Sequence, residues 1–393
     1  MYKTKRDIVR KLSNIKIVLG NGFDLFCGLK SSYNDFFEYR KEQYKMFKII
    51  ENNIIRNINE DVDYFYENDI NLSKEDYIKN TVWDLYFYLE SPNKKETKWC
   101  DVEESMKKSF NTLNTFNWST ILRGLNSCDG RVTNNEKMIC CMYFLKKKYN
   151  LNYPINVNDF YKILYKELVI FEQSFGYYID NQVSANYEKY MYNCKNTLLK
   201  LSENLNTINS ISSFNYSNIS EFYDWNITKI ENINGDTKNP IFGIDSNLFS
   251  PTDVEYRFTK IDRRIDLDME YNYMKEHMGF NNLIFFGHSL NEQDYGYLFP
   301  LLDIIDANNN NPNKKIVFAY YIYNKEYEKN IRRNVKIQAE KLIYEYAKSK
   351  GDKDNRLLER LWNNKRIIFY EIDDSKERDL PLRTDNYRPY SKF

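Results

Sequence analysis

The sequence has few residues that could bind a metal ion. Of its 393 residues, two are histidine and six are cysteine. The cysteines form no C-x-x-C pair, and the adjacent Cys140 and Cys141 are poorly placed to chelate one ion. A zinc site would therefore lack ligands, and we expect no metal cofactor. We interpret the six cysteines as buried, reduced thiols.

Long hydrophobic runs and an excess of one charge are also missing. The longest apolar stretches, such as 282–287, are far shorter than the ~20 residues that a membrane helix needs. Residues 1–14 are charged and lack the apolar core of a targeting segment. Lys and Arg (57) nearly balance Asp and Glu (56), so attraction to nucleic acid or to an anionic membrane is not indicated. We therefore expect a cytoplasmic protein.

Five short runs of apolar and β-branched residues predict strands, at 15–20, 208–214, 282–287, 315–323 and 366–372. Near-continuous apolar runs of this length are typical of parallel strands covered on both faces. A helical pattern fills the long interval between the first two runs. We predict an α/β fold with a three-layer parallel sheet, formed by residues 1–40 and 201–393, and a mainly helical insertion at 41–200.

The first strand leads into Gly20-Asn21-Gly22 and then into a helical pattern. Glycines in such a turn let backbone N–H groups approach a phosphate, and a helix N-terminus adds partial positive charge. The full fingerprint G-x-G-x-x-G is absent, because residue 25 is leucine. A simple tight turn explains the two glycines equally well. Asp24 is open to two interpretations, a ligand contact or the N-cap of the helix.

Several segments together resemble the AbiH family of bacterial abortive infection proteins. They are GNGFD at 20–24, with Gly28-Leu29, Ser31 and Tyr33 after it; Trp99, Asp101 and Glu103; Phe171-Glu172; FNYS at 214–217; NPIFGID at 239–245; and FFGHSLNEQD at 285–294. The resemblance implies a protein that defends a bacterium against phage. It leaves open whether a phage-derived molecule triggers the protein and whether the protein forms a homo-oligomer.

AbiH proteins are in turn similar to the sirtuin-like, Rossmann-like fold that consumes NAD. The resemblance implies NAD as substrate or ligand, bound by loops at the ends of parallel strands, where open α/β sheets bind ligands. It implies binding roles for Gly20, Asn21, Gly22, Phe23, Asp24, Phe214, Tyr216, Gly287, Ser289 and Asp294. It implies catalytic positions at Asn215, Asn234 and His288. Asn215 would hold a ribose hydroxyl or a water beside the anomeric carbon.

The chain departs from these resemblances at two positions. Ser217 replaces the aspartate of the sirtuin-like Asn-x-Asp segment. In addition, both families usually carry a His-Gly pair whose histidine is the general base. Here the pair is Asn234-Gly235, and asparagine cannot take up a proton. Asp24, Asp236 and Asp245 are alternative bases, and His288 is the one histidine within a motif. Two hypotheses follow: an NAD glycohydrolase, or a non-catalytic module that senses a nucleotide or a phage component.

The segment GHSLN at 287–291 also resembles a hydrolase nucleophile elbow that lacks its last glycine. No histidine follows residue 288, so the Ser-acid-His order of that fold cannot be completed. We expect Asn291 and Asp294 to cap the helix that begins near 292. We expect the Trp99-Asp101-Glu103 segment to supply caps and a solvated helix face rather than a site.

Overall fold

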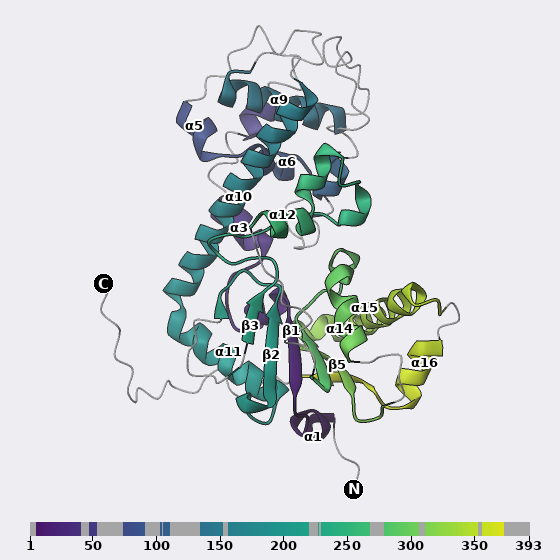
Figure 1. Ribbon diagram of the computed structural model, residues 1–393. Helices are drawn as coiled ribbons and strands as arrows, with labels where there is room; N and C mark the ends of the chain where they lie inside the picture. The colour runs from purple at the N-terminus through teal and green to yellow at the C-terminus, as the bar shows by residue number, and fades with distance from the viewer. Residues whose placement is uncertain are drawn as a thin grey trace.

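A computed structural model describes most of the chain: residues 5–40, 47–52, 74–90, 103, 105–110, 134–151, 156–219, 227, 229–267, 279–305, 311–352 and 356–372. Its centre is a six-stranded, all-parallel sheet in the order β3-β2-β1-β4-β5-β6 (Figure 1). The strands are β1 (Ile15–Leu19), β2 (Ile208–Ser213), β3 (Lys229–Asn232), β4 (Asn282–Phe286), β5 (Lys315–Tyr320) and β6 (Ile367–Glu371).

The five apolar runs form β1, β2, β4, β5 and β6, as predicted. Strand β3, whose four residues read KIEN, was not predicted from the sequence. Among the described strands it pairs with β2 alone, and it is half-buried along its whole length. An edge strand of this kind needs no continuous apolar run, so the pattern that revealed the central strands is absent from it.

Helices cover both faces of the sheet. On one face lie α14 (Tyr295–Ile304), α15 (Glu328–Ser349) and α16 (Arg356–Asn363), packed against Val18, Phe285, Phe318 and Phe369. On the other lie α1 (Lys5–Arg10), α2 (Asn21–Phe26) and α11 (Tyr187–Leu201), packed against Ile17, Leu19, Phe286 and Val317. Alternate residues of each strand point to opposite faces, so both sets are buried. The three-layer α/β fold is confirmed.

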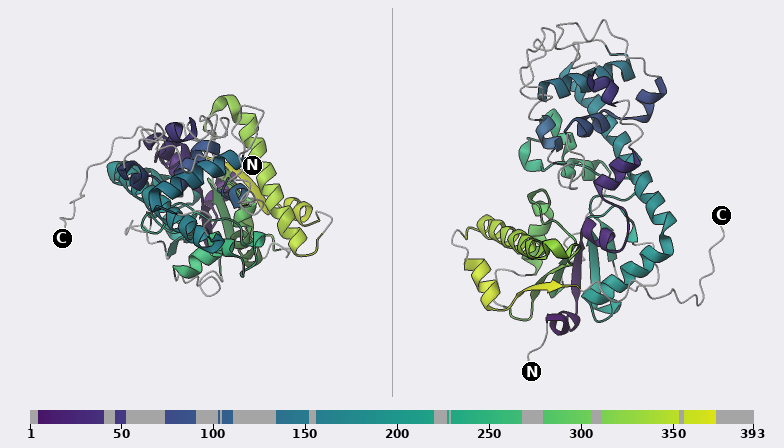
Figure 2. Two further views of the ribbon diagram at one scale, coloured as in Figure 1. Left: turned by 90° about the horizontal axis from the view of Figure 1, so that it is seen from above. Right: turned by 180° about the vertical axis from the view of Figure 1, so that it is seen from behind.

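The other helices stand beyond the edge at which the strands end (Figures 1 and 2). They are α3 (Tyr33–Tyr39), α5 (Lys74–Lys79), α6 (Val82–Glu90), α9 (Asn134–Tyr149), α10 (Val157–Ala185) and α12 (Lys260–Asp266). Short 3₁₀ helices are η2 (Leu205–Thr207), η5 (Ser246–Leu248), η6 (Val254–Phe258), η7 (Glu292–Asp294) and η8 (Lys325–Tyr327). The long helix α10 runs from this helical part down beside the sheet (Figure 1).

Packing does not follow the predicted division at residues 41 and 200. Helix α11 lies within 41–200, yet its Cys194 and Leu198 are part of the core on the sheet. Conversely, Phe242 and Phe258 lie within 201–393 but pack into the core of the helical part. The helical part and the sheet core therefore each contain residues from both of the predicted ranges, 41–200 and 201–393.

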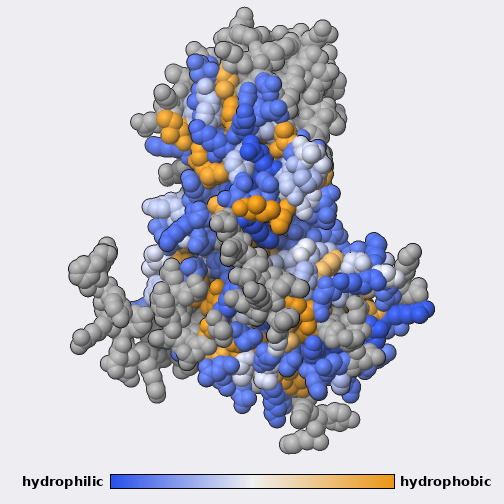
Figure 3. Space-filling view, in the orientation of Figure 1, coloured by the Kyte–Doolittle hydropathy of each residue, from blue (hydrophilic) through white to orange (hydrophobic). Residues whose placement is uncertain are grey.

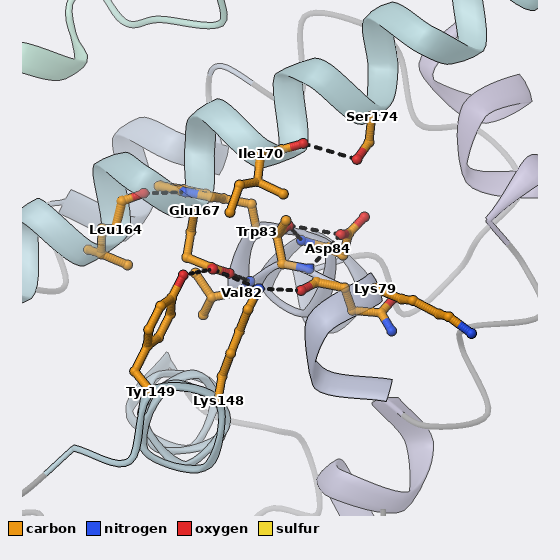
Figure 4. Close-up of polar contacts among 12 residues, drawn as sticks. Lys79, Val82, Trp83, Asp84, Lys148, Tyr149, Leu164, Glu167, Ile170 and Ser174 are labelled. Atoms are coloured by element: carbon orange, nitrogen blue, oxygen red, sulfur yellow. Dashed lines mark hydrogen bonds and ion pairs between the residues drawn. The ribbon is translucent and has the colours of Figure 1, made fainter. Parts of the chain in front are cut away.

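Buried acidic side chains tie the helical part together (Figure 4). Glu167 of α10 accepts a 2.7 Å hydrogen bond from the backbone N–H of Val82, the first residue of α6. The same carboxylate accepts a 2.5 Å bond from the Tyr149 hydroxyl and forms a 2.7 Å ion pair with Lys148. One carboxylate thus satisfies an otherwise unpaired helix N-terminus and links α6, α9 and α10.

The described surface on the face drawn in Figure 3 is mostly hydrophilic, with small, separate hydrophobic patches. Scattered apolar residues of this kind are common on folded proteins. Among the described residues, no helix is long and apolar enough to cross a membrane. Cys27, Cys140, Cys141 and Cys194 are buried and form no disulfide among the described residues, as predicted, while Cys100 and Cys128 lie outside the described residues.

Candidate functional site

A cavity of about 440 Å³ lies at the edge of the sheet where the strands end. Three loops contribute to its wall: the turn after β1, the segment 214–217 after β2, and the segment 287–289 after β4. Glu103, α10 and Lys260 complete it from the helical part. β1 pairs with β2 on one side and β4 on the other, so the cavity lies where the strand order reverses. Open α/β sheets bind ligands at such a point.

Twelve of the thirteen predicted site residues line this one cavity. They are Gly20, Asn21, Gly22, Asp24, Phe214, Asn215, Tyr216, Asn234, Gly287, His288, Ser289 and Asp294. The exception is Phe23, which is buried in the sheet core and packs edge-on against Phe286. The structure thus brings these twelve residues together around one cavity, while the function of each residue stays a prediction.

The turn after β1 packs backbone against backbone on the loop after β4. Gly20 N–H donates to the carbonyl of Phe286 at 3.1 Å, and Gly22 N–H donates to that of Gly287 at 2.9 Å. A Cβ added at Gly20 would lie 2.5 Å from the Cα of His288, and one added at Gly22 would lie 2.7 Å from the Cα of Gly287. The close approach of the two backbones requires glycine at both positions even when no ligand is bound. It also uses the backbone N–H groups of both glycines in hydrogen bonds.

Asp24 is not a helix cap. Its carboxylate accepts three hydrogen bonds: from the Tyr190 hydroxyl at 2.8 Å, Asn215 Nδ2 at 2.9 Å and the Ser217 hydroxyl at 2.7 Å. Burial raises the pKa of Asp24 to about 6, although these three bonds act to lower it. The hydroxyl group of Ser217, the last residue of the FNYS segment, thus donates to Asp24. A carboxyl group that titrates this close to neutrality can exchange a proton.

Asn215 has one satisfied end and one unsatisfied end. Its Nδ2 is held by Asp24, while its Oδ1 is buried with no hydrogen-bond partner among the described residues. An unpaired buried acceptor costs about 1–3 kcal/mol, so native structures rarely leave one. Asn215 lines the cavity, and a hydrogen-bond donor on a ligand would satisfy this oxygen.

Asn234, in place of the expected histidine, is engaged through both ends of its amide. Nδ2 donates to the carbonyl of Phe214 at 3.2 Å, and Oδ1 accepts from Arg264 Nη2 at 3.1 Å. It therefore joins the loop after β2 to α12. The two alternative bases Asp236 and Asp245 accept bonds from nearby backbone N–H groups and do not line the cavity.

His288 is neutral and already hydrogen-bonded. Its Nδ1 accepts a 2.9 Å bond from Leu290 N–H, so its proton resides on Nε2, which lies 3.6 Å from Asp294 Oδ2. Burial lowers the pKa of His288 to about 4, although Asp294 acts to raise it. The ring packs edge-on against Phe214, with centroids 4.3 Å apart. These contacts shape the loop and use the nitrogen lone pair that a general base needs.

Lys260 is a cavity residue that was not predicted from the sequence. Its Nζ lies 2.8 Å from Glu103 Oε1 and 2.9 Å from Asp294 Oδ1, and all three side chains line the cavity. The expectation of a solvated face for Glu103 is wrong, because its side chain is buried. Asn291 and Asp294 occupy the N-cap positions of η7 and α14, as expected, but neither makes a side-chain capping hydrogen bond. Trp99 and Asp101 lie outside the described residues.

The sequence KIDRRID at 260–266 contained a signal for the buried charges around Lys260. Lys260, Arg263 and Arg264 are spaced i, i+3, i+4 and so share one face of α12. Arg263 forms a buried two-bond ion pair with Glu172 of α10, at 2.9 and 2.6 Å. Burial raises the pKa of Glu172 to about 7, with Arg263 acting to lower it. The basic face of α12 thus holds the helix over the cavity.

Among the described residues, no group of three or more His, Cys, Asp and Glu side chains could hold a metal ion. The family model for bacteriophage abortive infection AbiH matches residues 17–320. The chain belongs to the AbiH family. The match runs from β1 to the end of β5 and includes all three loops of the AbiH cavity, together with Lys260. Searches among curated proteins and among solved structures found no match. The predicted family is confirmed.

Proposed function

We propose that this AbiH protein acts in phage defence by binding a nucleotide, with NAD as the first candidate, in the cavity at the ends of β1, β2 and β4. One observation carries the proposal: the Oδ1 atom of Asn215 is buried, unpaired among the described residues and part of the cavity wall. A ribose hydroxyl could donate the hydrogen bond that Asn215 Oδ1 lacks.

The sheet supports a nucleotide over other small ligands. Its order, β3-β2-β1-β4-β5-β6, is the order of the doubly wound sheets that bind dinucleotides between the first and fourth strands. The cavity of about 440 Å³ falls within the range of about 300–1,000 Å³ for small-molecule sites. Both facts support the proposal of a nucleotide site in this cavity.

Hydrolysis of NAD is a second candidate function, and Asp24 is the observation that favours it. The bond between ribose C1′ and the nicotinamide nitrogen would break with its electron pair going to nicotinamide. Water would add its oxygen to C1′, and the proton released by that water would pass to Asp24. A pKa of about 6 suits a group that accepts a proton near neutral pH. His288 and Asn234 are engaged elsewhere, so binding without cleavage is the alternative.

Calorimetry of the full-length protein with NAD tests binding, and an assay of nicotinamide release tests cleavage. Asn215→Ala should weaken binding about tenfold or more, because the ligand loses a buried hydrogen bond. Asn247→Ala is a matched control, since Asn247 is exposed and does not line the cavity. A wild-type protein that does not bind NAD at millimolar concentration would contradict the proposal.

Asp24→Asn separates the two candidate functions. If Asp24 is the base, the variant should still bind NAD but should release little nicotinamide. Equal release by the variant and the wild-type protein would exclude Asp24 as the base. Binding by the wild-type protein with no release would identify a nucleotide-binding module.

A further inference from the structure

Among the described residues that line the cavity, one has a cationic side chain, Lys260. It is 7% exposed, and its Nζ lies between the carboxylates of Glu103 and Asp294, at 2.8 and 2.9 Å. Glu103 belongs to the helical part and Asp294 to η7 beside the sheet. The ammonium group is therefore held at a fixed point of the wall where the two parts of the molecule meet.

The glycine turn is poorly suited to hold a phosphate. The N–H groups of Gly20 and Gly22 already donate to the carbonyls of Phe286 and Gly287. The following helix, α2, has six residues, so it contributes little dipole. A phosphate group in this cavity must find its positive charge at another residue.

We propose that Lys260 is the residue that binds the phosphate of the ligand, in place of the glycine turn; this inference rests on the proposed nucleotide site. A lysine ammonium has three protons to donate. Two are directed at Glu103 and Asp294, which leaves one for a phosphate oxygen. The unpaired Asn215 Oδ1 on the same wall independently indicates that the cavity accepts a ligand.

The charges around Lys260 fit this role. Burial acts to lower the pKa of Lys260, but Asp294 and Glu103 outweigh it, so its pKa is raised and the ammonium stays charged. Burial raises the pKa of Glu103, and the neighbouring Asp294 acts in the same direction. Lys260 and Arg264 act to lower this pKa, but it remains raised. A phosphate adds a further negative charge beside these groups. Glu103 should therefore take up a proton when the phosphate binds.

Two ligands that differ by one phosphate test the inference on the full-length protein: nicotinamide riboside and nicotinamide mononucleotide. The wild-type protein should bind the mononucleotide about 10- to 100-fold more tightly, as expected for a charge-assisted hydrogen bond. Lys260→Met should abolish this ratio, because only the mononucleotide carries the phosphate that the ammonium group would bind. Lys30→Met is the control, because Lys30 is an exposed lysine next to the wall residue Ser31.

The outcomes separate this inference from the proposed function. Equal affinity for the two ligands, or a ratio that persists in Lys260→Met, would overturn the role of Lys260 while the nucleotide site stands. Failure of both ligands and of NAD to bind would overturn the nucleotide site and this inference with it.

Lys260→Met leaves two buried carboxylates without their cation, so a second variant guards against misfolding. Glu103→Gln keeps the ammonium group and its contact with Asp294. Calorimetry at pH 7.5, in two buffers with different heats of ionisation, should show proton uptake when the wild-type protein binds the mononucleotide. Glu103→Gln should bind the mononucleotide with no proton uptake. The same uptake in both proteins would contradict the proposed exchange at Glu103.

Discussion

The backbone N–H of Gly22 lies 2.9 Å from the carbonyl oxygen of Gly287, and this bond joins the turn after β1 to the loop after β4. The two loops belong to neighbouring strands at the point where the order of the sheet reverses. Backbone contact between them fixes one wall of the cavity. The Gly20-Asn21-Gly22 turn of this AbiH protein therefore has a structural role: it holds the loops after β1 and β4 together.

Gly287→Ala should destabilise the protein by about 2 kcal/mol or more. Gly287 has a φ of +67°, and a Cβ there would lie 2.2 Å from the backbone nitrogen of Phe23, so strain and collision act together. Gly296→Ala in α14 is the control: its Cβ meets nothing within 4 Å, and alanine favours a helix by up to about 1 kcal/mol. Urea unfolding measures both. Equal unfolding midpoints would contradict the close contact.

Asp24 should make stability fall as the pH rises from about 4 to about 6. Its pKa is raised from 3.8 to about 6, so the folded state binds more protons than the unfolded state in this window. The stabilisation is complete below pH 4, is lost through pH 6, and amounts to about 3 kcal/mol. Asp24→Asn should flatten this part of the profile.

The measurement is the free energy of unfolding in urea at several pH values. Glu172, whose pKa is raised to about 7, should leave a residual slope up to that pH in both proteins. Asp159→Asn, at an exposed position on α10, should keep the wild-type profile. If Asp24→Asn does the same, the carboxyl group does not titrate as described.

Glu172→Met should cost about 3–5 kcal/mol, because it leaves the buried guanidinium of Arg263 unpaired. Adding Arg263→Met should recover much of this loss. The exposed pair Lys162–Asp159 provides the comparison: Lys162→Met should change the free energy of unfolding by less than about 1 kcal/mol. Thermal and urea unfolding distinguish the two cases. Similar losses at both pairs would show that α12 does not depend on Glu172.

His288→Asn and His288→Ala should differ. Asparagine Oδ1 can accept the hydrogen bond from Leu290 N–H that Nδ1 accepts now, while alanine cannot. We expect the asparagine variant to keep NAD binding and the alanine variant to lose part of it, because the loop after β4 loosens. Loss of nicotinamide release in His288→Asn with unchanged NAD binding would instead identify His288 as a catalytic base.

Much of the sheet could be predicted because central strands are locally encoded. Buried on both faces, β1 and β4 need apolar side chains at nearly every position, and the sequence shows such runs directly. The half-buried strand β3 has no such requirement and was missed. The site loops could be placed for a related reason: parallel strands end at the same edge, so segments that follow them converge.

The contacts of individual side chains could not be predicted. Asp24 is joined to Tyr190, Asn215 and Ser217 from distant parts of the chain, and a local pattern cannot separate this arrangement from a helix cap. Lys260 pairs with Glu103 within the helical part and with Asp294 beside the sheet, and the second contact exists only because the helical part docks on the edge of the sheet.

The sequence by itself determined the α/β class, the AbiH family and the three loops of the cavity, because apolar runs and motifs are local. The tertiary structure alone decided three features of the described residues: the backbone contact that the glycines allow, the unpaired Oδ1 of Asn215, and the place of the Lys260 ammonium group in the cavity wall. Burial and pairing decide the chemistry of such groups, and both arise only when distant segments pack together.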